Sequence, residues 1–272
     1  MKKILCPTDF SETAQSAIAY AAKLAQVMQA DLTLLNVQSV FDLTPVEVFR
    51  GRLTTLADAT ERLDAESRQI SKAFRISCYS EVQSSSSRLS TVIQEKAKGY
   101  DLIVMGSDGP DDLYQFFSGS NTYNSILRSE TPFVVVPSGY VYSEIGTIVY
   151  AFDYLHEKNL PLTRLVPIVK AFKCQLTILQ VMEEGYNKQA EDDLKELQFI
   201  IKNIYGDDLH FQYDTIRSSE IAQSINSYIL RSQPDALALC SVHRNLLQRL
   251  FHKSVIKHLT AFSSYPVFVI PQ

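Results

Sequence analysis

The chain has 272 residues, 46% of them hydrophobic, which suffices for one large domain or for two ordinary ones, each with its own core. With 26 Lys and Arg against 30 Asp and Glu, it lacks the basic excess of a general nucleic-acid or membrane-surface binder. The four cysteines are far apart and form no CxxC pair, and no apolar run has the length of a signal peptide or of a bilayer span. We therefore expect a soluble cytoplasmic protein with reduced thiols.

In chain order, short apolar strands alternate with helices. In the first half the predicted strands are Ile4–Pro7, Leu32–Val37, Ile76–Val82, Leu102–Met105 and Phe133–Val136. The first helix begins after an N-cap at Ser11, a second spans Leu56–Phe74, and another covers about Asn121–Ser129. The serine run Ser84–Ser87 is interpreted as a loop before a helix. The strands are continuously apolar, as expected for a parallel sheet buried on both faces.

The second half of the chain repeats this pattern. ADLTLLNV (30–37) matches CQLTILQV (174–181) at an offset of 144, whereas YDLIVMG (100–106) matches PDALALC (234–240) at an offset of 134. The second copy is therefore ten residues shorter in its middle. Its predicted strands are Thr147–Ala151, Leu176–Val181, Leu209–Ile216, Ala236–Leu239 and Val267–Ile270, with a helix near Glu191–Ile204. We place the domains at residues 1–140 and 141–272.

Two segments of the first copy carry a ligand-binding pattern. In a doubly wound sheet, ligands bind beyond the carboxyl ends of the strands, where the winding direction reverses. Asp9 follows the first strand and offers a carboxylate suited to ribose hydroxyls. After the fourth strand comes G-x2-G-x9-G-[ST]: Gly106 for a sharp turn, Gly109 for bare backbone, and Gly119-Ser120 opening a helix whose free N–H groups attract anions.

PTDFS, LTLLNV, DLIVMGSDG and GSN-x6-RS-x2-PFVVVP together resemble the universal stress protein family, over nearly all of residues 1–140 and more faintly over 145–272. The resemblance implies two Rossmann-like α/β domains of the adenine nucleotide alpha hydrolase-like type, each a five-stranded, mostly parallel sheet with helices on both faces. It implies adenine near Val37, ribose at Asp9 and phosphates near the glycines. The nucleotide-binding residues it implies are Pro7, Thr8, Asp9, Val37, Met105, Gly106, Gly109, Gly119, Ser120 and Asn121. Family members commonly dimerise through their last strands, so the two copies could form an internal pseudo-dimer, with a further homodimer possible.

Acidic residues in the first copy keep the identity of the ligand open. Asp108, Asp111 and Asp112 would repel a triphosphate unless Mg²⁺ intervened, so ATP, AMP, another adenosine ligand or no ligand all remain compatible with the sequence. The glycines alone could also serve only to shape a turn and a helix cap.

The second copy has lost the glycine pattern. Cys240, His243 and Lys253 replace Gly106, Gly109 and Gly119, although Asp153 still matches Asp9. The same binding mode is therefore not expected there. The retained Asp153 also leaves open a structural purpose for Asp9.

The function that we predict is stress-response sensing through an adenine nucleotide in the first domain, with an unidentified protein partner. Two alternatives are open: a ligand-free interaction scaffold, and a slow Mg²⁺-dependent ATPase. The sequence contains no recognisable catalytic set: there is no G-x-S-x-G elbow, P-loop or GxGxxG after the first strand.

Overall fold

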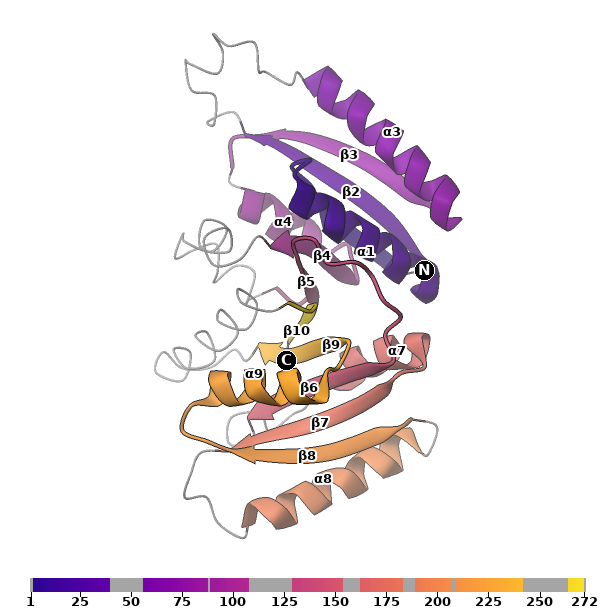
Figure 1. The fold of residues 1–272 in the computed structure, drawn as a ribbon. Coiled ribbons are helices and arrows are strands. Elements are labelled where there is room, and N and C mark those ends of the chain that lie inside the picture. The colour runs from indigo at the N-terminus through magenta and orange to yellow at the C-terminus, as the bar shows by residue number, and fades with distance from the viewer. Residues whose placement is uncertain are drawn as a thin grey trace. The chain divides into compact units, whose positions relative to one another are not determined.

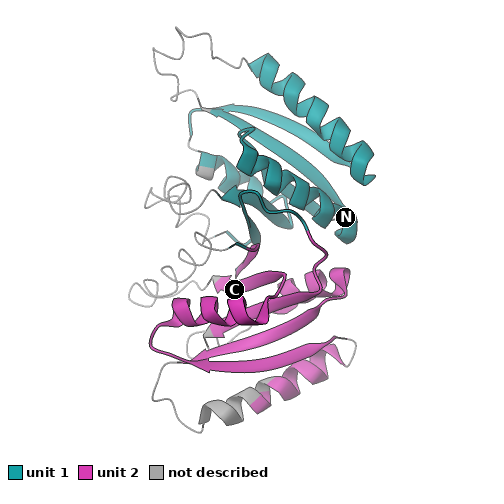
Figure 2. Cartoon of the chain, viewed as in Figure 1, with its two compact units in different colours: residues 1–142, 260–264, 271 teal, residues 143–259, 265–270, 272 magenta. Residues whose placement is uncertain are grey.

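A computed structural model describes residues 2–39, 56–87, 89–107, 129–153, 162–182, 189–206, 209–241 and 264–271. The chain divides into two compact units (Figure 2). Unit 1 consists mainly of residues 1–142, and unit 2 mainly of residues 143–259 and 265–270. No helix in the described ranges is both long and apolar enough to cross a membrane.

Unit 1 is an α/β unit in which strands and helices alternate (Figure 1). Its elements are β1 (Lys2–Pro7), α1 (Glu12–Met28), β2 (Ala30–Ser39), α3 (Leu56–Phe74), β3 (Cys78–Ser85), α4 (Leu89–Ala97), β4 (Leu102–Ser107) and β5 (Phe133–Pro137). The strands form a parallel sheet in the order β3-β2-β1-β4-β5. Helices α1 and α3 contact each other, and both contact β2. The connection through α4 then returns the chain to β4, which lies on the other side of β1.

Unit 2 repeats this arrangement. Its elements are β6 (Thr147–Asp153), α7 (Leu162–Phe172), β7 (Gln175–Met182), α8 (Gln189–Tyr205), β8 (Phe211–Arg217), α9 (Ile221–Ser232), β9 (Ala236–Ser241) and β10 (Val267–Pro271). The strand order is β10-β9-β6-β7-β8, and the registered neighbours are parallel. The predicted fold class is confirmed.

The strand registers reproduce the offsets seen in the sequence. Pro7 in β1 pairs with Leu35 in β2, and Ala151 in β6 pairs with Leu179 in β7, which is the same pair moved by 144 positions. Ile4 of β1 pairs with Leu102 of β4, as Ile148 of β6 pairs with Ala236 of β9, so the 134 offset holds for the fourth strand. The internal repeat is thus a repeat of hydrogen-bonding register, and not only of composition.

An aspartate fastens the start of the first strand to the start of the fourth in both units. In unit 1, Asp101 accepts a hydrogen bond from the Lys3 N–H through Oδ2 at 2.7 Å, and its own N–H donates to the Lys3 carbonyl at 2.8 Å. In unit 2, Asp235 Oδ2 accepts from the N–H groups of Gly146 at 2.9 Å and Thr147 at 2.8 Å, and from the Thr147 hydroxyl at 3.1 Å. We call this arrangement the aspartate clamp.

The structure confirms the N-cap and the apolar strands, and corrects one predicted loop. Ser11 Oγ accepts from the Ala14 N–H at 3.2 Å, as an N-cap serine does. The residues of β5 from Phe133 to Val136 are all buried. Of the serine run, Ser84 and Ser85 belong to β3 and pair with β2, so the predicted loop begins later than expected. Hydrogen bonds of the sheet there outweigh the turn preference of serine.

The start of β3 is also displaced from its prediction. The Ile76 N–H donates to the Ser71 carbonyl at 3.3 Å, which closes the end of α3, so the strand begins at Cys78 and not at Ile76.

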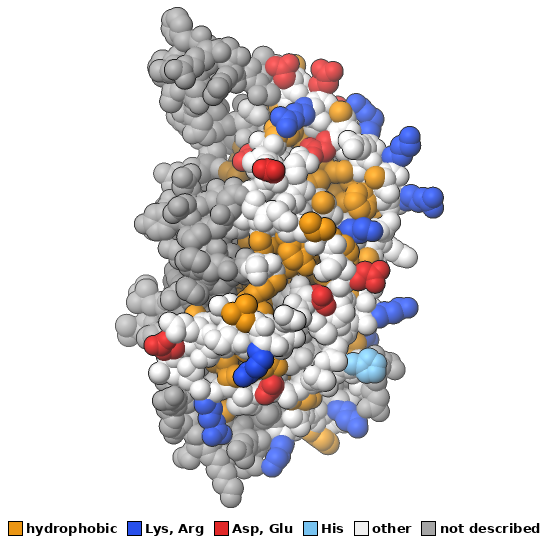
Figure 3. All heavy atoms as spheres, in the orientation of Figure 1, with side chains coloured by type: hydrophobic (Ala, Val, Ile, Leu, Met, Phe, Trp, Pro, Cys, Tyr) orange, Lys and Arg blue, Asp and Glu red, His pale blue; other side chains and the backbone are white. Residues whose placement is uncertain are grey.

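Charges of both signs are interspersed over the face displayed in Figure 3, in keeping with the balanced composition.

Candidate functional site

The ends of β1 and β4 form the switch point of unit 1. The chain winds from β1 through β2 to β3 on one side and then returns to β4 on the other side of β1. Because the strands are parallel, their carboxyl ends meet at one edge of the sheet, which is where open α/β sheets bind ligands. Pro7 ends β1, and Met105 and Gly106 lie in the last half of β4, so these three predicted site residues share that edge. Pro7 and Met105 are buried.

A buried polar network fixes the chain as it leaves β1. The Thr8 N–H donates to the Leu35 carbonyl at 2.8 Å, and the Thr8 carbonyl accepts from Asn36 Nδ2 at 2.8 Å. Gln38 Nε2 in turn donates to Asn36 Oδ1 at 2.6 Å. Thr8 and Asn36 are only 6% and 3% exposed, so these bonds satisfy groups that would be costly to bury unpaired. Val37, the predicted adenine contact, follows Asn36 in β2 and is half-buried.

Asp9 is exposed on a short loop in which side chains of the loop accept hydrogen bonds from its own backbone. Its Oδ1 accepts from the Ser11 N–H at 2.9 Å, and the Phe10 N–H donates to Thr8 Oγ1 at 3.1 Å. Phe10 has a φ of 66°, a left-handed conformation that costs a non-glycine residue energy. Asp9 Oδ2 has no partner among the described residues. One carboxylate oxygen thus holds the loop in shape, through the Ser11 N–H.

Gly106 serves packing and not the sharp turn that the sequence suggested. It lies inside β4, pairs with Val136 of β5, and has no positive φ. A Cβ at this position would lie 2.7 Å from both Cγ2 and the carbonyl oxygen of Thr13, in the first turn of α1. Any side chain would therefore push α1 away from the sheet. The strand also continues to Ser107, beyond the predicted end at Met105.

Arg62 of α3 is a residue near the site that the sequence did not reveal. Its guanidinium carbon lies 4.3 Å from the centroid of the Phe10 ring, a cation–π contact that brings a positive charge beside the Asp9 loop. Gln15 of α1 bonds Glu66 of α3 at 2.6 Å, and this contact joins the two helices. No local motif marks Arg62, because only the packing of α3 brings it near β1.

Part of the predicted site lies outside the described residues. Gly109, Gly119, Ser120 and Asn121 belong to that part, as do Asp108, Asp111 and Asp112, and the helix predicted for 121–129 does so except for Ser129. His243 and Lys253, the replacements in the second copy, also lie outside it. The predicted phosphate contacts therefore stay predictions.

The equivalent edge of unit 2 has different chemistry. Phe152 stands where unit 1 has Thr8, and Gln180 stands where it has Asn36. Gln180 is 1% exposed, and its Nε2 donor has no hydrogen-bond partner among the described residues. Cys240 replaces Gly106 and is buried. Asp153 ends β6 at the position equivalent to Asp9.

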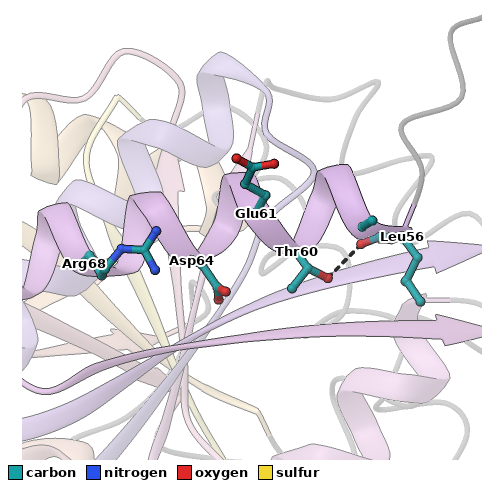
Figure 4. A pocket seen from close by; sticks show the side chains of 6 residues that line it. Leu56, Thr60, Glu61, Asp64 and Arg68 are labelled. Carbon is teal, nitrogen blue, oxygen red and sulfur yellow. Dashed lines mark hydrogen bonds between the residues drawn. The ribbon is translucent and has the colours of Figure 1, made fainter.

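A separate pocket of about 680 Å³ runs along α3, lined by Leu56, Ala57, Thr60, Glu61, Asp64 and Arg68. In Figure 4, Leu56, Thr60 and Asp64 point to one side of the helix and Glu61 to the other. The Thr60 hydroxyl donates to the Leu56 carbonyl at 2.7 Å, and Asp64 accepts from the Ser80 hydroxyl, so these two polar lining residues are already bonded within the unit. None of the predicted site residues lines this pocket, and we do not place the nucleotide there.

The thiols of Cys6, Cys78 and Cys174 offer no activated nucleophile. Burial raises the pKa of Cys6, and it raises the pKa of Cys78 to about 12 and that of Cys174 to about 11. These thiols therefore stay protonated near neutral pH, which is the unreactive form. None of the four cysteines forms a disulfide bond in the described part of the chain.

Comparison with known proteins identifies the family. Residues 1–137 match the model of the universal stress protein family. A curated universal stress protein of Methanocaldococcus jannaschii is 27% identical over 154 residues, which is 50% of this chain and 94% of the relative. A universal stress protein from Archaeoglobus fulgidus matches at a TM-score of 0.77 with 19% identity, over 99% of this chain and 98% of its own, so the two share a fold across both units.

A universal stress protein family protein from Arabidopsis thaliana, solved with AMP bound, is 16% identical and matches at a TM-score of 0.37, over 51% of this chain and 93% of its own. The family model covers just over half of the sequence, including the whole β1–β4 edge described above. The chain belongs to the universal stress protein family.

Proposed function

We propose that unit 1 binds an adenine nucleotide, ATP or AMP, at the carboxyl edge of β1 and β4, and that the protein acts as a stress-response sensor. The observation that carries this proposal is Asp9: an exposed carboxylate at the switch point, with Oδ1 held by the Ser11 N–H at 2.9 Å and Oδ2 without a partner among the described residues. Such a carboxylate oxygen can accept hydrogen bonds from the two hydroxyls of a ribose.

The edge beside Asp9 is suited to a flat, apolar base. Val37 is half-buried beside Asn36, whose side chain is already used to hold the Thr8 carbonyl. Adenine placed there would contact apolar surface without displacing a buried hydrogen bond. Because these groups are fixed before a ligand arrives, binding costs little ordering entropy.

The phosphate end of the ligand decides between ATP and AMP. We assign phosphate contacts to Gly109, Gly119, Ser120 and Asn121 on the strength of the sequence pattern. Arg62 adds a positive charge next to the β1–α1 loop. Asp108, Asp111 and Asp112 favour AMP, or ATP accompanied by Mg²⁺, over free ATP.

Calorimetric titration with ATP and with AMP, each with and without Mg²⁺, tests the proposal. The informative variant is Asp9→Asn, which keeps an acceptor for the Ser11 N–H but removes the charge. We expect the unaltered chain to bind one nucleotide. In Asp9→Asn the affinity for that nucleotide should fall about 10- to 100-fold, which is the usual contribution of a hydrogen bond to a charged group. The matched control is Asp153→Asn at the equivalent position of unit 2, where affinity should not change.

Two results would overturn the proposal. If protein shown to be nucleotide-free gave no heat with either nucleotide, the ligand-free scaffold would replace it. If Asp9→Asn and the unaltered chain bound equally well, the nucleotide would have to lie elsewhere. The cytoplasmic location, the protein partner, the internal pseudo-dimer of the two copies and any homodimer are part of the same proposal, and light scattering checks the last of these.

A further inference from the structure

Residues Ser138–Tyr142, which follow β5, form a segment that we call the strap. The strap is tied to β4 at its first residue, where the Ser138 N–H donates to the Ser107 carbonyl at 2.8 Å. It is tied to α1 there as well, because Thr13 Oγ1 donates to Ser138 Oγ at 3.2 Å. The strap therefore begins in direct contact with both elements that frame the candidate site.

Further contacts fasten the strap along α1. The Gly139 N–H donates to Ser16 Oγ at 3.1 Å. The Tyr20 ring lies 5.9 Å from that of Tyr140 and 5.5 Å from that of Tyr142, and it is almost fully buried.

Thr13, Ser16, Tyr20 and Lys23 are spaced three or four residues apart, so they form one face of α1. Lys23 Nζ extends this face, at 5.9 Å from the centroid of the Tyr142 ring. One side of the helix is thus given over to the strap for about three turns.

The same helix begins at the candidate site. Its N-cap, Ser11, also donates its N–H to Asp9, so a ligand that pulls on the Asp9 carboxylate acts on the first turn of α1. Thr13 in that turn packs against Gly106 with no room for a side chain between them. A small movement of α1 or of the end of β4 therefore cannot be absorbed at this contact and passes to the strap.

We infer that the strap is coupled to nucleotide binding: a nucleotide held between the β1–α1 loop and the end of β4 also orders Ser138–Tyr142, the stretch through which the chain leaves unit 1. The inference rests on the proposed function, and it names the structural change that nucleotide binding would produce. By linkage the coupling is reciprocal, so loosening the strap weakens nucleotide binding.

Hydrogen exchange followed by mass spectrometry on the full chain tests the coupling, with peptides that cover residues 138–142 and saturating ATP or AMP. We expect the nucleotide to slow exchange in the strap about tenfold or more. The variant Ser16→Ala removes the acceptor of the Gly139 N–H, and in it the slowing should be mostly lost and affinity should fall about two- to tenfold. The control is Gln15→Ala, the neighbouring residue on α1 that bonds Glu66 and not the strap; it should keep the slowing and the affinity.

Calorimetry on the same samples separates the two ways to fail. If a nucleotide binds but exchange at 138–142 does not change, the coupling is wrong and the proposed function stands. If Ser16→Ala and Gln15→Ala behave alike, the strap contacts carry no coupling. If no nucleotide binds, the proposed function fails and the coupling falls with it.

Discussion

The two units share a scaffold and differ at one edge. Their strands have the same order and, in the first, second and fourth strands, the same register, and the aspartate clamp recurs at Asp101 and Asp235. Three of their differences lie toward the carboxyl edge of the strands: Thr8 against Phe152, Asn36 against Gln180 and Gly106 against Cys240. The fold is specified by the apolar strands and their pairing, so the edge residues can change without loss of the sheet. Within this chain, fold and site are therefore separable.

The largest effect is expected when a side chain is introduced at Gly106 of unit 1. In Gly106→Val the new Cβ meets backbone and side chain of Thr13 at 2.7 Å, and we expect a loss of about 3 kcal/mol in the free energy of unfolding, measured by urea denaturation. Gly146→Ala is the control, because its Cβ would meet only Asp235 Oδ2 at an ordinary 3.6 Å. A Gly106→Val protein as stable as the control would show that α1 can move away from β4 at no cost.

The aspartate clamp should be worth more in unit 2 than in unit 1. Asp235 Oδ2 accepts three hydrogen bonds and Asp101 Oδ2 accepts one. Asp235→Ala is expected to cost about 2 kcal/mol and Asp101→Ala about 1 kcal/mol, since hydrogen bonds to charged groups contribute more than neutral ones. Urea denaturation of both variants measures this difference. Equal losses would mean that the additional bonds of Asp235 are replaced by water.

The buried amides predict opposite outcomes for the same substitution. Asn36→Leu leaves the Thr8 carbonyl without its buried donor and should destabilise the chain by about 1–3 kcal/mol. Gln180→Leu removes an unpartnered Nε2, loses only a 3.5 Å contact from Thr215, and should be neutral or slightly stabilising. Thermal unfolding compares the two. A large loss in Gln180→Leu would point to an ordered water on that amide.

The smallest effect expected is a gradual loss of stability at alkaline pH. In the unfolded chain, thiols ionise near pH 8.5, whereas burial raises the pKa of folded Cys78 to about 12 and that of Cys174 to about 11. Between these values the folded chain holds more protons, so the free energy of unfolding falls as pH rises from about 8.5. Cys78→Ala in unit 1 should flatten this fall between pH 8 and 10, as should Cys174→Ala in unit 2. A profile unchanged in both variants would assign the loss to other groups.

The sequence predicts the scaffold well because the scaffold depends on local pattern. Apolar runs, the N-cap at Ser11 and the two repeat offsets all appear in the structure with small shifts at the strand ends. The aspartate clamp was also visible in the sequence, since Asp101 and Asp235 align at the 134 offset in otherwise apolar matches. Its meaning depends on a partner at the start of another strand, which the repeat alone does not indicate.

The site is harder to predict because its residues act through neighbours distant in sequence. A glycine after an apolar strand, such as Gly106, is typical of a turn. Only the position of Thr13 shows that Gly106 is needed because a side chain there would clash with α1. Arg62 reaches Phe10 from α3 and belongs to no motif. Asn36 is a polar residue inside the apolar run LTLLNV, and a buried polar side chain needs a hydrogen-bond partner. That partner is the Thr8 carbonyl.

The length difference between the two copies has a consequence for engineering. It falls between the second strand and the next helix, residues 40–55 in one copy and 183–188 in the other, while the strands on either side keep their pairing. The two copies of the fold thus have connections that differ by ten residues at this point. Since β2 ends at the edge that holds Asp9 and Val37, a permuted fluorescent protein inserted directly after Ser39 would begin near the proposed ligand, and its emission would then report whether the proposed nucleotide is bound.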